Sequence, residues 1–499
     1  HPHFVLPWYN AYSEIYSPLI VIGYQNNIKV GLMFLGQSKE NNITHAGDHQ
    51  AEYHGWLTKK EFEEEFIVST LITLNKKFSL NTWEWRWLPK NYSQSWIYSD
   101  LLKNNNINCI PTPIDVPLFT LANLERFTKI KKNKTVKNLI NRYKRNGDFH
   151  IERVTTKEKA EILIEEVIKQ YDFRIFSQTG LAPFGFDKNK KAFYLNKMEY
   201  PKNVHFSVLW AGETPIAFHI GDCDDKTLFY GLPSFSPMEF KNSPGRIFLI
   251  KLSELLIEEG FETFDLTPGM DANKEKFSNE SFDTLRPTFY FDKATFLKAQ
   301  TKVKGKKHLK SLLSKFNQDV DSVKKTLDNI STKTKSKISP KVKQQLNIYK
   351  YNTELSSENL NPNSKNIRTN CYEDLLLKTD IEPSEIFDAQ QKLANEETLY
   401  SVLQKDKLVS YVWVEKDKAF HFEDGNKLDL KLAEKNITIY DFYSDPALDI
   451  NDILQKIIEN IIATNLSNDI ENIYVIDRSS DDSIKSILSN LNFELKNTF

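Results

Sequence analysis

Three segments of the chain share one pattern: a run rich in β-branched and aromatic residues, a short polar turn, and a second such run. They cover residues 19–35, 204–220 and 399–414, with turns at Asn26-Asn27, Gly212-Glu213 and Lys405-Asp406. Short polar turns between such runs predict β-hairpins. The three turns are almost equally spaced along the chain, which predicts a repeat of domain size.

The pattern after each hairpin predicts further elements in a common order. Helices are expected at 59–74, 246–259, 449–463 and 482–490, and strands at 82–88, 227–232, 263–266, 437–442 and 472–476. The helix predictions rest on apolar residues that recur three and four positions apart, as in Ile247, Ile250 and Leu252. Hairpin, strand, helix, strand is an α/β order with mixed central sheets flanked by helices.

The 499 residues divide into four predicted parts. These are an N-terminal lobe at 1–118, a second lobe at 119–297, a basic helical linker at 298–365 and a C-terminal lobe at 366–499. The linker is rich in Lys, Ser, Asn and Thr, and its apolar residues show helical spacing from Leu309 to Ile330. No aromatic residues interleave with its lysines, which favours a solvated connecting helix over a nucleic-acid-binding one.

The composition of the chain argues against several classes of protein. Apolar residues make up 40% and charged residues 27%, as in ordinary globular proteins. The formal net charge is −1, so the whole chain has no field that attracts nucleic acid, and we expect no nucleic-acid partner. The three cysteines are far apart and form no disulfide framework, which is typical of a reducing compartment. The longest apolar runs are strand-sized, so we expect no signal peptide, no transmembrane segment and a cytoplasmic location.

The segment from Tyr230 to Phe277 carries the most informative chemistry. Ser243 suits an N-cap, Pro244 suits the first helical position, and Gly245 allows close approach of a ligand to the backbone. Unpaired amides and the positive dipole at such a helix start favour binding of a pyrophosphate. The candidate contacts are Lys241, Ser243, Gly245, Arg246 and Ile247. A capped helix without any ligand would carry the same motif, so the motif alone leaves both interpretations open.

Several motifs occur in a fixed order around this helix. They are Ser243-Pro244-Gly245, Glu258-Glu259-Gly260, Phe264-Asp265, Gly269 and Lys274, preceded by Glu52-Tyr53-His54-Gly55, Lys137 to Gly147, and Tyr171 to Arg174. In this order the chain resembles, over roughly residues 1–295, the CelD-type acetyltransferases of cellulose biosynthesis. These carry a BioF2-like acetyltransferase domain of the Gcn5-related N-acetyltransferase (GNAT) superfold. The sequence departs from that family at Asn273, where the family has tyrosine.

The resemblance implies tandem GNAT-like lobes and an acyltransferase that uses acetyl-CoA or another acyl-CoA as co-substrate. It implies that the carrier pyrophosphate lies on the helix start at 243–247. The thioester would lie between the strands expected at 227–232 and 263–266. The implied acceptor is a polar small molecule or a glycan precursor in cell-envelope or polysaccharide synthesis, acylated on nitrogen or oxygen.

Acyl transfer needs a base for the nucleophile and a donor for the oxyanion. Asp265 is the first candidate, as a base or as an anchor for a substrate amine, and His219 is a second candidate base. Lys274 could hold a phosphate or an acidic substrate, and Arg174 is a further candidate contact for a substrate anion. Three of these residues have a structural alternative: a helix or turn cap near Gly269 for Asp265, a buried structural residue for His219, and a solvated helix lysine for Lys274.

A metal site is not expected. His45, His49 and His54 are close in sequence, but their spacing is irregular and no cysteine accompanies them.

The C-terminal lobe is expected to be GNAT-like but degenerate. Its phosphate loop would lie at 444–449, which has no glycine and carries Asp445 and Asp449. Two carboxylates oppose a bound pyrophosphate electrostatically. We therefore expect this lobe to serve packing or a protein partner.

Two other functions remain open. A Fem-like aminoacyl transferase has paired GNAT lobes but uses aminoacyl-tRNA, and would need a strongly basic surface. A non-catalytic scaffold built of GNAT-like lobes would bind no acyl carrier.

Overall fold

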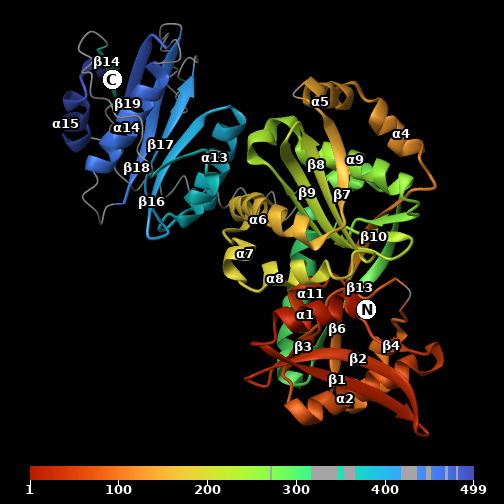
Figure 1. Cartoon of the computed structure of the whole chain (residues 1–499). Helices are drawn as coiled ribbons and strands as arrows, with labels where there is room; N and C mark the ends of the chain where they lie inside the picture. The colour runs from red at the N-terminus through yellow and green to blue at the C-terminus, as the bar shows by residue number, and fades with distance from the viewer. Residues whose placement is uncertain are drawn as a thin grey trace. The chain divides into compact units, whose positions relative to one another are not determined.

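The computed structural model describes residues 1–90, 92–145, 147–269, 272–315, 346–352, 366–416, 435–445, 451–466, 470–478 and 482–498. These residues form two compact units (Figure 1). The described residues of 1–167, 187–234 and 244–315 belong to the first unit, and those of 168–186, 235–243 and 346–498 to the second. Both are mixed α/β structures, which confirms the predicted fold class.

The N-terminal part of the first unit is a four-stranded antiparallel sheet covered by a helix. Its elements are α1 (Pro2–Ala11), β1 (Tyr16–Gln25), β2 (Ile28–Ser38), β3 (Ile43–His45), β4 (Leu57–Thr58), α2 (Glu63–Phe78), β5 (Thr82–Glu84) and α3 (Asp100–Asn104). The predicted first hairpin is confirmed, and φ is 49° at Asn26 and 64° at Asn27. Positive φ at both turn residues matches the twist of the two strands. A 3₁₀ turn at Lys60–Phe62 delays the predicted helix, and β5 is shorter than predicted.

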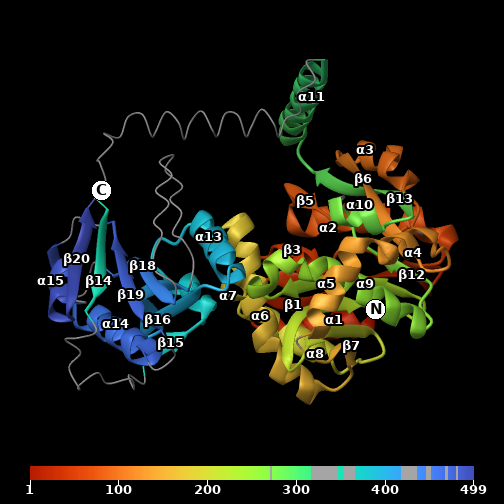
Figure 2. The ribbon, with the colours of Figure 1, turned by 90° about the horizontal axis from the view of Figure 1, so that it is seen from above.

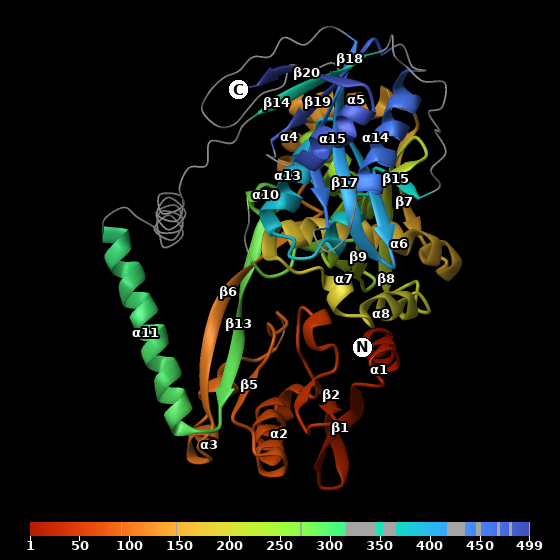
Figure 3. The ribbon, with the colours of Figure 1, turned by 90° about the vertical axis from the view of Figure 1, so that its left-hand side faces the viewer.

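A second sheet of the first unit joins its N-terminal and middle parts. Its strand order is β10-β12-β6-β13-β5, with β10 at Thr227–Phe229, β12 at Thr263–Asp265, β6 at Asn108–Thr120 and β13 at Glu280–Tyr290. The long strands β6 and β13 run side by side and antiparallel, from the pair Asn108 and Tyr290 to the pair Leu118 and Glu280 (Figure 3). The boundary predicted near residue 118 therefore falls inside a strand of a shared sheet.

Strand β6 was not predicted, because its three prolines argue against a central strand. Pro111, Pro113 and Pro117 all have odd numbers, and the odd residues of β6 direct their backbone groups away from β13. The carbonyl of Pro117, for example, accepts from the amide of Leu266 on the β12 side. Strand β12 pairs with β6 only at residues 118–120. The rest of the β6 edge on that side has no β12 partner to receive an amide hydrogen bond. The prolines are thus accommodated without loss of a ladder bond.

The middle part of the first unit is a four-stranded sheet with order β11-β9-β8-β7. The elements along residues 125–277 are α4 (Glu125–Lys132), α5 (Lys134–Arg145), β7 (Phe149–Val154), α6 (Lys157–Thr179), α7 (Pro183–Phe186), α8 (Lys190–Lys197), β8 (Val204–Ala211), β9 (Thr214–Asp222), β10 (Thr227–Phe229), β11 (Leu232–Phe235), α9 (Pro244–Glu258), β12 (Thr263–Asp265) and α10 (Ala272–Phe277). Of these, α7, residues 168–179 of α6 and Phe235 at the end of β11 belong to the second unit. Helix α9 packs on this sheet and buries Ile247, Ile250 and Leu252, three of the residues that predicted it. The single strand predicted at 227–232 was wrong, because β10 and β11 belong to different sheets.

Most of the predicted linker lies outside the described residues. Helix α11 spans Lys293–Lys315, so only the first residues of the helix expected at 309–330 fall within it.

The second unit contains a seven-stranded sheet with order β15-β16-β17-β18-β19-β14-β20 (Figure 2). The elements are β14 (Asn347–Tyr351), β15 (Ile367–Thr369), α13 (Pro383–Ala394), β16 (Thr398–Gln404), β17 (Lys407–Lys416), β18 (Asn436–Ser444), α14 (Asn451–Leu466), β19 (Asn472–Asp477), α15 (Asp482–Asn490) and β20 (Phe493–Thr498). The third predicted hairpin is confirmed as β16–β17. Strands β18 and β19 are parallel at Asn436–Ile439 and Asn472–Val475, and α14 connects them, so this lobe repeats the order of β10, α9 and β12.

Candidate active site

Two neighbouring parallel strands of the first unit separate after a short stretch of pairing. Strands β10 and β12 pair over only three residues each, Thr227–Phe229 with Thr263–Asp265. The amide of Tyr230 donates to the carbonyl of Asp265 at 2.8 Å, and β11 then continues in the other sheet beside β9. Loops that leave the carboxyl ends of such strands are the usual ligand-binding edge of α/β sheets.

Two glycines allow the strands to cross closely at this point. A Cβ atom on Gly231 would lie 2.4 Å from the carbonyl oxygen of Ile220, and one on Gly221 would lie 2.2 Å from that of Phe229. Backbone oxygens cannot move aside as a flexible side chain can. The separation of the strands therefore depends on glycine at both positions.

Asp265 ends β12 at the separation, and its side chain is only 5% exposed. The Tyr53 hydroxyl donates to this carboxyl group, with distances of 2.9 and 3.1 Å to its two oxygens. The Thr267 amide donates to one of them at 2.8 Å. Thr267 has φ of 61°, an unusual conformation for a β-branched residue. Such strain persists where the surroundings impose it, often at functional sites.

The surroundings of Asp265 raise its pKa toward the range that suits a general base at neutral pH. Burial raises its pKa from 3.8 to about 6, and nearby Glu52 acts in the same direction. The Thr267 amide, the Tyr53 hydroxyl and the charge of Lys274 oppose that rise. Burial and the adjacent carboxyl group raise the pKa of Tyr53, so its phenol stays protonated and remains a donor. An aspartate with this pKa is ionised at pH 7 yet holds a proton more readily than an exposed one.

Tyr53 comes from the N-terminal part of the unit and was not among the predicted site residues. A backbone bridge to Trp87 holds Tyr53, and its ring meets Phe229 edge-on at 6.0 Å between centroids. The motif Glu52-Tyr53-His54-Gly55 was the available signal, although a separation of 212 residues gave no reason to pair it with Asp265. Tyr53 places a phenol beside Asp265. At Asn273 the chain itself lacks the tyrosine found in the CelD-type family that its sequence resembles.

The hydrogen bond from Tyr53 stabilises the ionised carboxylate of Asp265. Replacing Tyr53 by phenylalanine removes that bond and should therefore raise the pKa of Asp265. A hydrogen bond to a charged group contributes about 1.5–3 kcal/mol, equivalent to about one pH unit or more. If acyl transfer requires ionised Asp265, the acid limb of kcat/KM against pH should move upward by about that amount. Tyr92→Phe is the matched control, because that hydroxyl donates to the carbonyl of Trp56 instead. An acid limb at the same pH in both variants would contradict the coupling.

Lys274, from α10, lies beside the same turn. Its ammonium group donates to the carbonyl of Thr267 at 3.2 Å and contacts the Thr267 hydroxyl at 3.4 Å. The lysine thus holds the strained turn and adds positive charge near Asp265. Its predicted contact with an acidic substrate stays a prediction.

His219, the second predicted base, is fully buried on β9. Its Nε2 accepts from the Gly231 amide at 3.0 Å, and its ring stacks on Tyr230 with 5.1 Å between centroids. Burial lowers its pKa well below 6.5, so the ring is neutral. This placement favours the structural alternative, in which His219 holds the strand crossing at Gly231.

The predicted phosphate-binding residues divide between the two units. Gly245, Arg246 and Ile247 form the first turn of α9 in the first unit, where the first amides of a helix have no acceptor within the helix. The Ile247 side chain is buried, so it would contribute through its amide only.

Ser243 and Lys241 belong to the second unit. Ser243 has φ of 52° and ψ of 53°, which is left-handed and differs from the extended backbone of an N-cap. The prediction of an ordinary serine N-cap was therefore wrong. The ammonium group of Lys241 donates to the side-chain carbonyl of Asn395. A role of either residue in phosphate binding stays a prediction.

Arg174 also belongs to the second unit, on the C-terminal part of α6. Its guanidinium lies over the rings of Phe235 and Tyr171, at 5.0 and 5.5 Å from their centroids. Its predicted contact with a substrate anion stays a prediction.

The histidines near residue 50 are arranged as packing rather than as ligands. His45 and His54 stack with 4.2 Å between ring centroids, and both are buried. The Nδ1 of His54 accepts from the Arg86 amide. Parallel stacked rings do not direct their nitrogens toward one ion. In the described part of the chain, no group of three or more His, Cys, Asp and Glu residues is placed to hold a metal.

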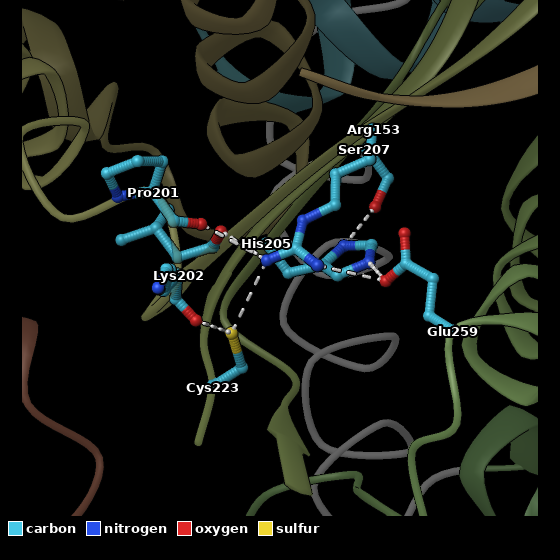
Figure 4. Close-up of polar contacts among 8 residues, drawn as sticks. Arg153, Pro201, Lys202, His205, Ser207, Cys223 and Glu259 are labelled. Carbon is cyan, nitrogen blue, oxygen red and sulfur yellow. Dashed lines mark hydrogen bonds and ion pairs between the residues drawn. The ribbon is translucent and has the colours of Figure 1, made fainter. Parts of the chain in front are cut away.

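A buried polar cluster elsewhere in the first unit has the contacts of a nucleophilic triad (Figure 4). The Ser207 hydroxyl lies 2.7 Å from Nδ1 of His205, and Nε2 of His205 lies 3.0 Å from the Glu259 carboxylate. Arg153 pairs with the same carboxylate at 3.0 Å. Ser207 and His205 have no exposed surface, so no substrate reaches the hydroxyl. The cluster instead anchors the end of α9 to strands β7 and β8.

Residues 131–275 match the family described as "Acetyltransferase (GNAT) domain". This segment of the chain is similar to that family, and it includes Asp265 and the start of α9. No curated protein matches. None of the described helices is long and apolar enough to span a lipid bilayer.

The solved structures that match this chain do so at low identity. FemX is 7% identical, with 59% of this chain and 92% of that chain covered and a TM-score of 0.38. A tandem GNAT protein from the clavulanic acid biosynthesis pathway is 8% identical, with 55% and 83% covered and a TM-score of 0.32. A conserved protein of unknown function from Bacteroides thetaiotaomicron is 12% identical, with 57% and 90% covered and a TM-score of 0.39. These scores do not bear on substrate or activity.

Proposed function

We propose that the chain transfers an acyl group from acyl-CoA to an amine or hydroxyl group of a polar acceptor. The observation that carries the proposal is the buried carboxyl group of Asp265, which contacts Tyr53 where β10 and β12 separate. The GNAT domain match over residues 131–275 supports the same chemistry.

The proposed reaction assigns a proton-transfer role to Asp265. The ionised carboxylate takes a proton from the acceptor, whose nitrogen or oxygen then attacks the thioester carbonyl. A new C–N or C–O bond forms, the C–S bond breaks, and the CoA thiolate takes up a proton. The Tyr53 hydroxyl and the Thr267 amide donate to this carboxylate and would hold its orientation during the reaction.

The first turn of α9 is the proposed contact for the carrier. Helix α9 follows β11 after a 3₁₀ helix at Pro237–Asn242, and the Asp265 turn follows β12 directly. The amides of Gly245 and Ile247 and the guanidinium of Arg246 suit a pyrophosphate in charge and geometry. Acetyl-CoA is the simplest donor, and the CelD-type resemblance suggests a small-molecule or glycan-precursor acceptor.

The test has two parts. Native mass spectrometry of the purified protein should detect retained CoA, and isothermal titration should show acetyl-CoA binding. Incubation with acetyl-CoA and panels of amino sugars, amines and hydroxylated acceptors should then release free thiol and give an acceptor heavier by one acetyl group. Absence of acyl-CoA binding would reject the proposal and leave the non-catalytic scaffold and the Fem-like aminoacyl transferase as the alternatives.

We expect one acyl-CoA site per chain, because the C-terminal lobe has an unsuitable loop. The Asp445 amide already bonds to the carbonyl of Val409, and Asp445 would bring negative charge toward a pyrophosphate. The rest of the predicted loop, including Asp449, lies outside the described residues. Two like charges 4 Å apart repel by about 1 kcal/mol even in water. Titration of the full chain should therefore saturate at one acetyl-CoA, and saturation at two would reject the assignment.

A further inference from the structure

Helices α4 and α5 follow each other along the first unit (Figure 1), and their exposed side chains carry a strong excess of positive charge. Residues 125–145, all within the described part of the chain, contain nine basic residues and one acidic residue. All nine basic side chains are exposed: Arg126, Lys129, Lys131, Lys132, Lys134, Lys137, Arg142, Lys144 and Arg145. The net charge of −1 for the whole chain concealed this local excess.

Three of these cations already have partners. Lys129 pairs with Glu125, Lys131 pairs with Glu254 on α9, and Arg126 donates to the carbonyls of Glu275 and Lys276. The other six have no carboxylate partner within salt-bridge distance among the residues that the structure describes. They are Lys132, Lys134, Lys137, Arg142, Lys144 and Arg145. A compact group of unneutralised cations attracts a polyanion.

The apolar residues of the two helices argue against two other kinds of polyanion. Phe127, Val136 and Tyr143 are buried within the unit, and Ile130, Leu139 and Ile140 are partly buried. None of these side chains is fully exposed, whereas interfacial helices insert exposed apolar residues into a lipid surface. No aromatic side chain of residues 125–145 is exposed, so bases of a single strand have no surface on which to stack.

We propose that the α4–α5 surface binds the phosphate backbone of a double-helical nucleic acid without reading its sequence. Helix α5 has twelve residues and is therefore about 18 Å long. A duplex presents about ten phosphate charges over that length, counting one per 1.7 Å of its axis. At helical spacing, Lys134 and Arg145 lie opposite the buried residues of α5 and Lys137 lies at the side of that face, so several cations can contact one duplex backbone together. This surface is independent of the proposed acyl-transfer chemistry.

The test measures binding of the full chain to short fluorescein-labelled RNA and DNA duplexes of arbitrary sequence, by anisotropy at several salt concentrations. Binding should weaken steeply with salt, and the two duplexes show which nucleic acid is preferred. The variant Lys134→Gln/Lys137→Gln/Arg145→Gln should weaken binding at least tenfold. It should also reduce the slope of log Kd against log salt by about 2.7, or about 0.9 per lost phosphate contact.

The matched control removes the same charge elsewhere in the same unit. Lys59→Gln/Lys60→Gln/Lys76→Gln alters three exposed lysines and should leave duplex affinity unchanged. Circular dichroism establishes that both variants fold. Equal effects of the two variants, or no duplex binding by the parent chain, would overturn the proposal. Binding to phosphatidylserine vesicles in place of duplexes would overturn it as well. Displacement of the duplex by equimolar acetyl-CoA would assign the cations to the carrier nucleotide instead.

Discussion

Replacing Asp265 by asparagine should lower kcat for acyl transfer by about 10²–10⁴-fold, the range for loss of a general base. Asparagine retains the shape of the side chain and can still contact Tyr53, but it cannot accept a proton from the acceptor. The dissociation constant for acetyl-CoA should change little, because the first turn of α9 binds the carrier. Steady-state kinetics and isothermal titration measure the two quantities separately.

The pH profile makes this test specific. Since burial raises the pKa of Asp265 to about 6, kcat/KM of the parent chain should rise as pH increases through that value and then level off. The Asp265→Asn variant should lack this limb. Asp283→Asn, which changes an exposed carboxylate on β13, is the control. Turnover that is unchanged in Asp265→Asn would make this aspartate a turn-capping residue.

The same substitution should also change the pH dependence of stability. The folded carboxyl group holds its proton up to about pH 6, whereas an unfolded one loses it near 3.8. Ionisation of wild-type Asp265 therefore costs folding free energy as pH rises between these values. The amide of asparagine does not titrate, so relative to wild type the variant should gain up to about 3 kcal/mol from pH 4 to pH 7. Urea unfolding at the two pH values measures this difference.

Replacing Gly245 by valine should weaken acetyl-CoA binding by about 10- to 150-fold. The side chain would keep a pyrophosphate from the amides of the first helical turn, and a hydrogen bond to a charged group contributes about 1.5–3 kcal/mol. Isothermal titration provides the measurement. Gly305→Val on α11 is the control, since no atom lies within 4 Å of the added Cβ there. An unchanged affinity in folded Gly245→Val protein would remove the carrier from this helix start.

Local patterns in the sequence determined the three hairpins and the helices between the parallel strands. Residues such as Asn26 and Asn27 set the turn by their own backbone preference, and apolar spacing alone identified α9. These features depend on residues only a few positions apart, which is why they can be recognised without the tertiary structure. The same kind of reasoning indicated Asp265 as a candidate, because the end of a predicted strand before a glycine-containing turn is a local feature.

Only the tertiary structure decided which distant residues meet. The prolines of β6 argued against a strand, because the sequence did not reveal which edge of β6 lacks a neighbouring strand. The strand expected at 227–232 divides between two sheets, because Gly231 lies against the backbone of β9. Tyr53 meets Asp265 across 212 positions, and burial at that contact sets the pKa of the carboxyl group. Packing between distant segments, which no local pattern encodes, therefore determines the proposed chemistry of this aspartate.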